Sequence, residues 1–229
     1  MCGIVGIYLK SKKFEKSLGG MLSKMLISME SRGPDSAGFA IYNKNKNKIY
    51  KYSICLNEVS FEKFRKEIKK KIILTKLDKN SDHVILKSTE KPSKIIPILE
   101  SFKGISLVGY GKSIEIFKQV GKPSNVVKKF DLNKFSGSHA IGHTRMATES
   151  AITTDGSHPY STGEDECLVH NGSLSNHNNL RRKLKKNGSK FNSDNDTEVA
   201  AGYISDSLKD RNLKQTLKKG LSDLDGFYT

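Results

Sequence analysis

The N-terminal part of the chain alternates between two hydrophobic patterns. Residues 2–9 form an apolar run that contains Ile, Val and Tyr, and this run predicts a buried strand. Within residues 14–30, Leu and Met recur at helical spacing and predict an amphipathic helix with one buried face. Residues 32–35 (RGPD) predict a turn, and residues 37–42 predict a second strand.

The later segments repeat this mixture. Residues 44–104 are rich in lysine, yet apolar residues recur throughout, so we predict a small α/β insertion there instead of disorder. The last residues, 226–229, open a strand with nothing after it, which suggests a fragment or a trimmed chain. Further helices are predicted over 62–73, 94–102, 125–130, 176–186, 197–208 and 213–221, and further strands over 82–86, 104–117, 137–146 and 168–170.

Charge and composition narrow the classes of protein. The net charge of +16 raises nucleic acid as a partner, but 34 of the 40 basic residues are lysine, whereas arginine is the usual reader of phosphates and base edges. We therefore predict no nucleic-acid partner. No apolar run approaches the roughly 18 residues of a spanning helix, and the N-terminus lacks a signal-peptide pattern. We expect a cytoplasmic protein with no membrane partner.

The cysteine count argues against two kinds of stabilisation. Cys2, Cys55 and Cys167 are odd in number and widely spaced, which disfavours both a disulfide framework and a zinc site. We expect no bound metal, and we interpret Cys55 and Cys167 as small buried hydrophobic residues.

Cys2 is the first candidate for chemistry. It directly follows Met1, and aminopeptidases remove the initiator before so small a residue. The new α-amine, with a pKa of roughly 7.7–8.0, then lies beside a thiol of pKa about 8.5. One residue can thus supply both nucleophile and base. A second-position cysteine is common, however, and is weak on its own.

Four more motifs follow Cys2 in a fixed order: residues 31–38 (SRGPDSAG), 142–148 (GHTRMAT), 170–172 (HNG) and 195–198 (NDTE). Together they resemble the class II, N-terminal-cysteine glutamine amidotransferases of the Ntn-hydrolase superfamily. Residues 111–116, 148–151 and 171–178 resemble one branch, the stand-alone amidotransferase subunit of the glutamate-synthase-like, N-methylglutamate synthase type.

The resemblance implies an α+β fold, an Ntn-hydrolase αββα sandwich of two antiparallel sheets flanked by helices. It covers residues 2–229 as one amidotransferase domain, with the Lys-rich α/β insertion at about 44–104 and with C-terminal strands missing. It implies that Cys2 attacks the side-chain amide of L-glutamine and that its own α-amine moves the proton. Asn171 and Gly172 would form the oxyanion hole.

The resemblance also implies a substrate-binding set. Arg145 would pair with the α-carboxylate of glutamine, Asp196 would hold the α-ammonium, and Arg32 would order the loop over the site; Thr148 joins them. No cofactor is expected on this chain. The ammonia would pass to a separate glutamate-synthase-like subunit that carries a flavin and an iron–sulfur cluster.

Each residue also has a plainer interpretation. Arg145 fits an ordinary ion pair, Asp196 fits the N-cap of the next helix, Asn171-Gly172 fits a hairpin turn, and residues 33–35 fit a simple turn. His143 and His170 fit core histidines. Taken singly these interpretations are favoured; jointly they do not explain why all the motifs occur in one family's order.

Two other function classes remain open. A catalytically silent or partner-dependent Ntn-fold assembly subunit would not need Cys2 together with both oxyanion-hole residues. An Ntn amidase acting on another amide would not need Arg145 and Asp196 together, which match the two charges of a free amino acid.

Overall fold

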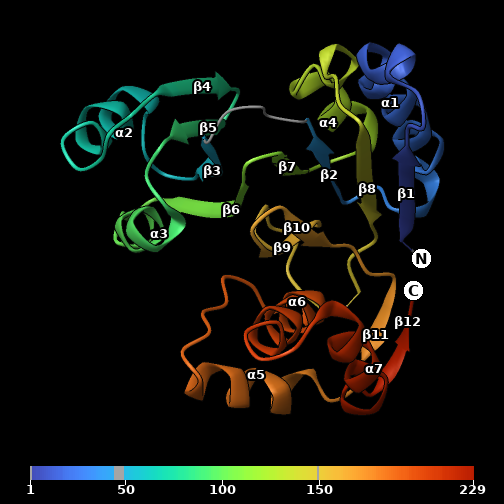
Figure 1. Cartoon of the computed structure of the whole chain (residues 1–229). Coiled ribbons are helices and arrows are strands. Elements are labelled where there is room, and N and C mark those ends of the chain that lie inside the picture. The colour runs from blue at the N-terminus through green and yellow to red at the C-terminus, as the bar shows by residue number, and fades with distance from the viewer. Residues whose placement is uncertain (1, 44–48, 149) are drawn as a thin grey trace.

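A four-stranded antiparallel sheet, called the central sheet, lies in the upper right of Figure 1. The computed structural model describes residues 2–43, 49–148 and 150–229. The sheet has the order β1 (Gly3–Tyr8), β8 (His139–Arg145), β2 (Ser36–Tyr42), β7 (Ile114–Val120). The predicted strands at 2–9, 37–42 and 137–146 are confirmed. Met1, whose removal is predicted, residues 44–48 of the predicted insertion and Glu149 lie outside the described residues.

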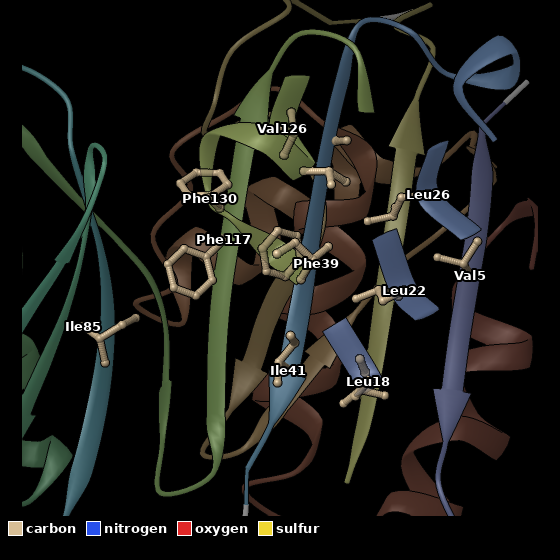
Figure 2. Packing of buried hydrophobic residues seen from close by; sticks show 14 residues of the cluster. Val5, Leu18, Leu22, Leu26, Phe39, Ile41, Ile85, Phe117, Val126 and Phe130 are labelled. Atoms are coloured by element: carbon tan, nitrogen blue, oxygen red, sulfur yellow. The ribbon is translucent and has the colours of Figure 1, made fainter. Parts of the chain in front are cut away.

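Helices α1 (Leu18–Ser28) and α4 (Pro123–Lys129) cover one face of this sheet. A short 3-10 helix, Lys12–Ser17, precedes α1. Leu18, Leu22 and Leu26 place one face of α1 against the aromatic side chains of the sheet, as Figure 2 shows. Phe39 is fully buried there, with its ring stacked on Phe117 at 5.4 Å between centroids. The helical spacing of leucines in 14–30 therefore produces the main core.

Four shorter strands lie between the central sheet and the last three helices (Figure 1), and Cys167 of this layer packs against the apolar cluster that contains Ala40. They form two antiparallel ribbons, β9 (Tyr160–Gly163) with β10 (Glu166–Leu168), and β11 (Gly172–Leu174) with β12 (Gly226–Tyr228). Three helices lie beyond the ribbons: α5 (His177–Lys186), α6 (Asp196–Ser207) and α7 (Leu213–Asp223) (Figure 1). The layers thus run helix, strand, strand, helix. The predicted α+β sandwich is confirmed, with ribbons in place of a continuous second sheet.

The Lys-rich segment builds a sheet of its own. Its order is β4 (Lys76–Asn80), β5 (His83–Ser88), β3 (Tyr50–Leu56), β6 (Ile105–Gly111). Helices α2 (Phe61–Ile68) and α3 (Pro92–Glu100) accompany this sheet, and their buried residues share a second apolar core with its strands. Because β6 pairs with β3, this unit continues to residue 111, beyond the predicted boundary at 104.

Several predicted elements end or turn elsewhere. The helix predicted over 62–73 ends at Ile68, because a run of three lysines follows and offers no apolar face. The strand predicted over 104–117 is two strands, β6 and β7. The chain reverses between them where the Asp165 carboxylate accepts the backbone N–H groups of Lys112, Ser113 and Ile114. The last predicted short strand, 168–170, lies in β10 only at Leu168.

Asn176 occupies the N-cap position of α5, but its side chain makes no capping bond; its amide donates to Asp223 O at 2.8 Å instead. Strands β3, β4, β9 and β11 were not predicted. Within the described part of the chain, no helix is both long and apolar enough to cross a membrane.

Candidate active site

Cys2 lies beside the end of β8. Strand β1 pairs with β8 in antiparallel register, Gly3 opposite Thr144, so the residue before β1 meets the residues that follow β8. The Sγ of Cys2 accepts the backbone N–H of Met146 at 3.4 Å. The thiol in turn donates to Met146 O at 3.7 Å, so both backbone groups of Met146 fix the position of the sulfur. This N–H donor was not predicted from the sequence.

Two side chains from distant segments hold the backbone of Cys2. Asn171 Nδ2 donates to Cys2 O at 3.2 Å, and Arg32 Nε donates to the same oxygen at 3.4 Å. The structure thus brings Arg32 and Asn171, which are 139 positions apart (171 − 32), to the same residue. Because an amide nitrogen has two N–H groups, Asn171 keeps one further donor.

Asn171 and Gly172 lie on a strand pair and do not form a hairpin turn. Asn171 and Thr229 exchange backbone hydrogen bonds at 3.3 and 3.2 Å. The next pair, Gly172 with Tyr228, is therefore a non-hydrogen-bonded pair, and the N–H of Gly172 points away from β12. A Cβ at Gly172 would lie 2.0 Å from Phe227 O, so the close strand approach requires glycine.

Arg145 ends β8 and is 4% exposed. Its guanidinium donates to Ala151 O and Ser150 O, each at 3.1 Å, and to Ser150 Oγ at 2.6 Å. Among the described residues it has no ion-pair partner, so the ordinary ion-pair interpretation is wrong for this part of the chain. Within the described residues these bonds use both Nη2 N–H groups and one Nη1 N–H group, and they leave Nε–H and the other Nη1 N–H.

Asp196 is the first residue of α6, and Asn195 is the residue that caps the helix. Asn195 Oδ1 accepts the N–H of Thr197 at 2.8 Å, so the interpretation of Asp196 as N-cap is wrong. Asp196 Oδ2 instead accepts the N–H of Leu174 at 2.9 Å. Its side chain is 11% exposed, and a carboxylate with about four acceptor positions keeps room for a cation.

These groups surround one small cavity of about 130 Å³. Asn171 and Arg32 do not line this cavity themselves; they donate hydrogen bonds to the carbonyl of Cys2, which does line it. The predicted residues that line it directly are Cys2, Arg145, Thr148, Gly172 and Asp196. Eight more residues line it that were not assigned to the site from the sequence: Met146, Ser150, His158, His170, His177, Asp194, Asn195 and Thr197.

The histidines next to the cavity are packed inside the protein. The rings of His143 and His158 stack with centroids 3.9 Å apart. Burial lowers the pKa of His143 to about 3 and the pKa of His158 well below its usual value, so both are neutral at pH 7. His143 Nε2 lies 2.9 Å from His170 O, and His170 Nδ1 lies 2.8 Å from Thr197 Oγ1. Both predicted core histidines are buried.

Residues 33–35 do more than reverse the chain. The N–H of Asp35 donates to Arg145 O at 3.1 Å, and Asp35 Oδ2 accepts the N–H of Ala147 at 2.8 Å. A Cβ at Gly33 would lie 2.3 Å from the backbone of Thr144. This turn therefore holds the segment after β8 against Cys2.

The other two cysteines lie elsewhere. Burial raises the pKa of Cys55 to about 12 and that of Cys167 to about 11, so both are thiols inside the protein. Cys55 lies with Asp82 and His83 in a group whose ligand atoms fall within 4.8 Å. Asp82 already accepts Lys129 Nζ at 2.7 Å and contacts His83 Nδ1 at 2.9 Å. Because the Asp82 carboxylate is already engaged by these two partners, we do not assign a metal ion to this group.

A cysteine just before the first strand, in a sandwich of helix, strand, strand and helix layers, resembles the arrangement of the N-terminal nucleophile (Ntn) hydrolases. Comparison with solved structures agrees on the fold. The chain aligns with an allosteric regulatory enzyme of purine biosynthesis at TM-score 0.58 and 21% identity, over 98% of this chain and 34% of that one. It aligns with glutamine phosphoribosylpyrophosphate amidotransferase from B. subtilis at TM-score 0.52 and 21% identity, over 98% and 33%.

Sequence comparison identifies the family. Residues 133–208 match the glutamine amidotransferase domain model. The chain is 46% identical to the glutamine amidotransferase-like protein GlxB of Rhizobium meliloti (strain 1021), over all of this chain and 78% of that protein. It is 31% identical to a putative glutamine amidotransferase of Methanothermobacter thermautotrophicus, over all of this chain and 80% of that protein. The chain belongs to the class II glutamine amidotransferase family, and it is an enzyme of that class.

Proposed function

We propose that Cys2 is the nucleophile with which this enzyme hydrolyses the side-chain amide of L-glutamine to glutamate and ammonia. One observation carries the assignment: opposite charges, Arg145 and Asp196, line the same 130 Å³ cavity as the Cys2 thiol. A free amino acid presents a carboxylate and an ammonium on one carbon, and these two side chains complement both.

The reaction follows from the contacts of Cys2. Its Sγ attacks the amide carbon of glutamine, and the thiol proton passes to the α-amine of Cys2, which is free once Met1 is removed. The negative charge on the amide oxygen is stabilised by the second N–H of Asn171 Nδ2 and by the N–H of Gly172. The α-amine returns the proton to the departing ammonia, which leaves a thioester. Water then cleaves the thioester and releases glutamate.

The remaining residues orient the substrate. The Arg145 guanidinium binds the α-carboxylate through its charge and a remaining N–H group, and the Asp196 carboxylate binds the α-ammonium. Thr148 lines the same cavity and contributes a hydroxyl. Arg32 and Asn171 keep the Cys2 carbonyl fixed, so the thiol holds one direction relative to Met146.

We further propose that the ammonia passes to a separate glutamate-synthase-like subunit, which forms glutamate or N-methylglutamate and carries any flavin and iron–sulfur cluster. The motifs shared with the stand-alone subunits of that branch support this assignment. Residues 44–134 carry +13 of the net charge (22 basic minus nine acidic), which favours an acidic partner surface and salt-sensitive association. A nucleophilic thiol must stay reduced, which favours the cytoplasm.

The test is the intact mass of the chain before and after incubation with a diazoketone analogue of glutamine, together with ammonia release from glutamine. We expect loss of Met1, one adduct that maps to Cys2, and ammonia release. Cys2→Ser is the matched control and should gain no adduct, while Cys55 and Cys167 stay unmodified. Loss of Met1 with neither adduct nor ammonia would reject the proposal in favour of a silent assembly subunit.

A further inference from the structure

Lys118 is a buried cation on β7 that the proposed reaction does not use. It is 4% exposed and, within the described residues, has no carboxylate in ion-pair contact. Its Nζ donates to Asp155 O at 3.0 Å and to Ser157 O at 2.9 Å, and it lies 4.4 Å from the centroid of the Tyr160 ring. An ammonium buried without a counter-ion is costly, so these contacts compensate for its lost hydration.

The two carbonyls belong to the segment that also holds Arg145. Residues 150 and 151 accept the Arg145 guanidinium, and residues 155–157 come four positions later. Gly156 lies between the two carbonyls that Lys118 binds, and Gly156 O accepts Asn195 Nδ2 at 3.3 Å. One ammonium therefore fixes the backbone on both sides of this contact.

Asn195 extends the connection to the other charged residue of the cavity. It caps α6 through Thr197, and Asp196 is the next residue in the chain. Arg145 and Asp196 are thus joined by hydrogen bonds through residues 150–157 and Asn195, and Lys118 fixes the middle of this connection. Lys118 itself does not line the 130 Å³ cavity.

We propose that Lys118 is a positioning residue that sets the separation of Arg145 and Asp196, and with it the fit of the amino-acid head group. The inference rests on the proposed function. Its expected signature is a change in glutamine affinity with little change in the chemical step, because Cys2 and Asn171 are held by other contacts.

A second cavity determines how the protein responds to the loss of this ammonium. Lys118, Asp155 and Tyr160 line a space of about 630 Å³ that does not include Cys2. Water from this space can solvate the freed carbonyl of Asp155, which lines it, whereas the buried Ser157 O loses its partner. Lys118→Met therefore loosens the segment 150–157. The same space has room for the larger guanidinium of Lys118→Arg.

The experiment compares Lys118→Met with Lys51→Met. Lys51 is also a buried strand lysine, 6% exposed, but it pairs with Glu115 at 2.8 Å, away from the segment 150–157. We expect Lys118→Met to raise the KM for glutamine about tenfold with kcat within about threefold, since small misplacements of binding groups weaken binding strongly. Lys51→Met should change the KM less than twofold, and Lys118→Arg should recover most of the loss.

A second readout separates positioning from general damage. Lys118→Met should slow modification of Cys2 by the diazoketone analogue, which carries the amino-acid head group, and leave modification by iodoacetamide, which lacks it, unchanged. Equal slowing with both reagents, or a KM equal to that of Lys51→Met, overturns the inference. If Lys118→Met is unfolded by circular dichroism, Lys118→Gln takes its place in the comparison. Wild-type protein without ammonia release refutes the proposed function itself, whereas an active wild type with an unaffected Lys118→Met refutes only this inference.

Discussion

Asp196→Asn tests the ammonium site without removing its structural contacts. An asparagine keeps one oxygen to accept the N–H of Leu174, and its amide nitrogen can face Thr197 Oγ1. The substitution therefore removes the negative charge and preserves the shape of the pocket. A hydrogen bond to a charged group contributes about 1.5–3 kcal/mol, which corresponds to a loss of about 10- to 150-fold in kcat/KM for glutamine.

The assay is a double-mutant cycle with the substrate as its second partner. Glutaramate is glutamine without the α-amine. We expect wild type to use glutaramate less well than glutamine by a similar factor, and Asp196→Asn to lose activity toward glutamine and not toward glutaramate. The difference between the two losses gives the energy of the carboxylate–ammonium contact.

Equal losses with both substrates would refute this reasoning, because Asp196 would then act only through Leu174 and Thr197. Asp194 gives a second check. It lines the same cavity and is exposed, so Asp194→Asn should change both substrates alike and weakly. A loss selective for glutamine in Asp194→Asn would transfer the ammonium site to that carboxylate.

Four other substitutions probe the contacts of Cys2, the core and a partly buried carboxylate. Asn171→Ala should lower kcat about 10²- to 10³-fold in steady-state ammonia release. Arg32→Ala removes the other donor to Cys2 O and should lower kcat less than about tenfold. Equal losses of kcat in the two variants would mean that Asn171 only holds the backbone of Cys2. Phe39→Ala should lower the free energy of unfolding in urea by about 3–5 kcal/mol, because it empties a fully buried site; a loss below about 1 kcal/mol would contradict this. Burial alone would raise the pKa of Asp82, but hydrogen bonds from His83 and Lys129 outweigh it and lower this pKa to about 2. The ionised carboxylate therefore stabilises the fold above pH 4, and this contribution is lost as the pH falls toward 2. The melting temperature of Asp82→Asn should therefore fall less than that of wild type between pH 5 and pH 3.

Strong periodicity made most of the central sheet and α1 predictable. The run that becomes β1 and the leucines of α1 each bury one face, so pattern and packing agree. Strand β4 has the sequence KLDKN and lies at a sheet edge, where Asp78 pairs with Lys87 across to β5. An edge strand held by ion pairs has no apolar alternation, and hydrophobic periodicity therefore does not reveal it.

The candidate site also has a predictable part and an unpredictable part. The family motifs indicated which residues lie at the cavity, but the spacing of residues along the chain did not determine which atoms they contact. Asn195 and Asp196 both fit an N-cap, and the choice depends on Leu174, whose N–H takes the Asp196 carboxylate. The N–H of Met146 at the Cys2 sulfur likewise depends on the register of β1 with β8, which is a pairing between residues about 140 positions apart.

That pairing has a consequence for biosynthesis. Among the strands of the described residues, β1 pairs with β8 alone, so during translation it has no partner until His139–Arg145 leaves the ribosome. The proposed removal of Met1 can therefore take place before the sheet closes around the N-terminal end, and the proposed site residues Asn171 and Asp196 are made later still. Long-range pairing of this kind folds slowly. We expect newly made chains to be processed at the N-terminus first and to gain the ability to break down glutamine only as the last step of maturation.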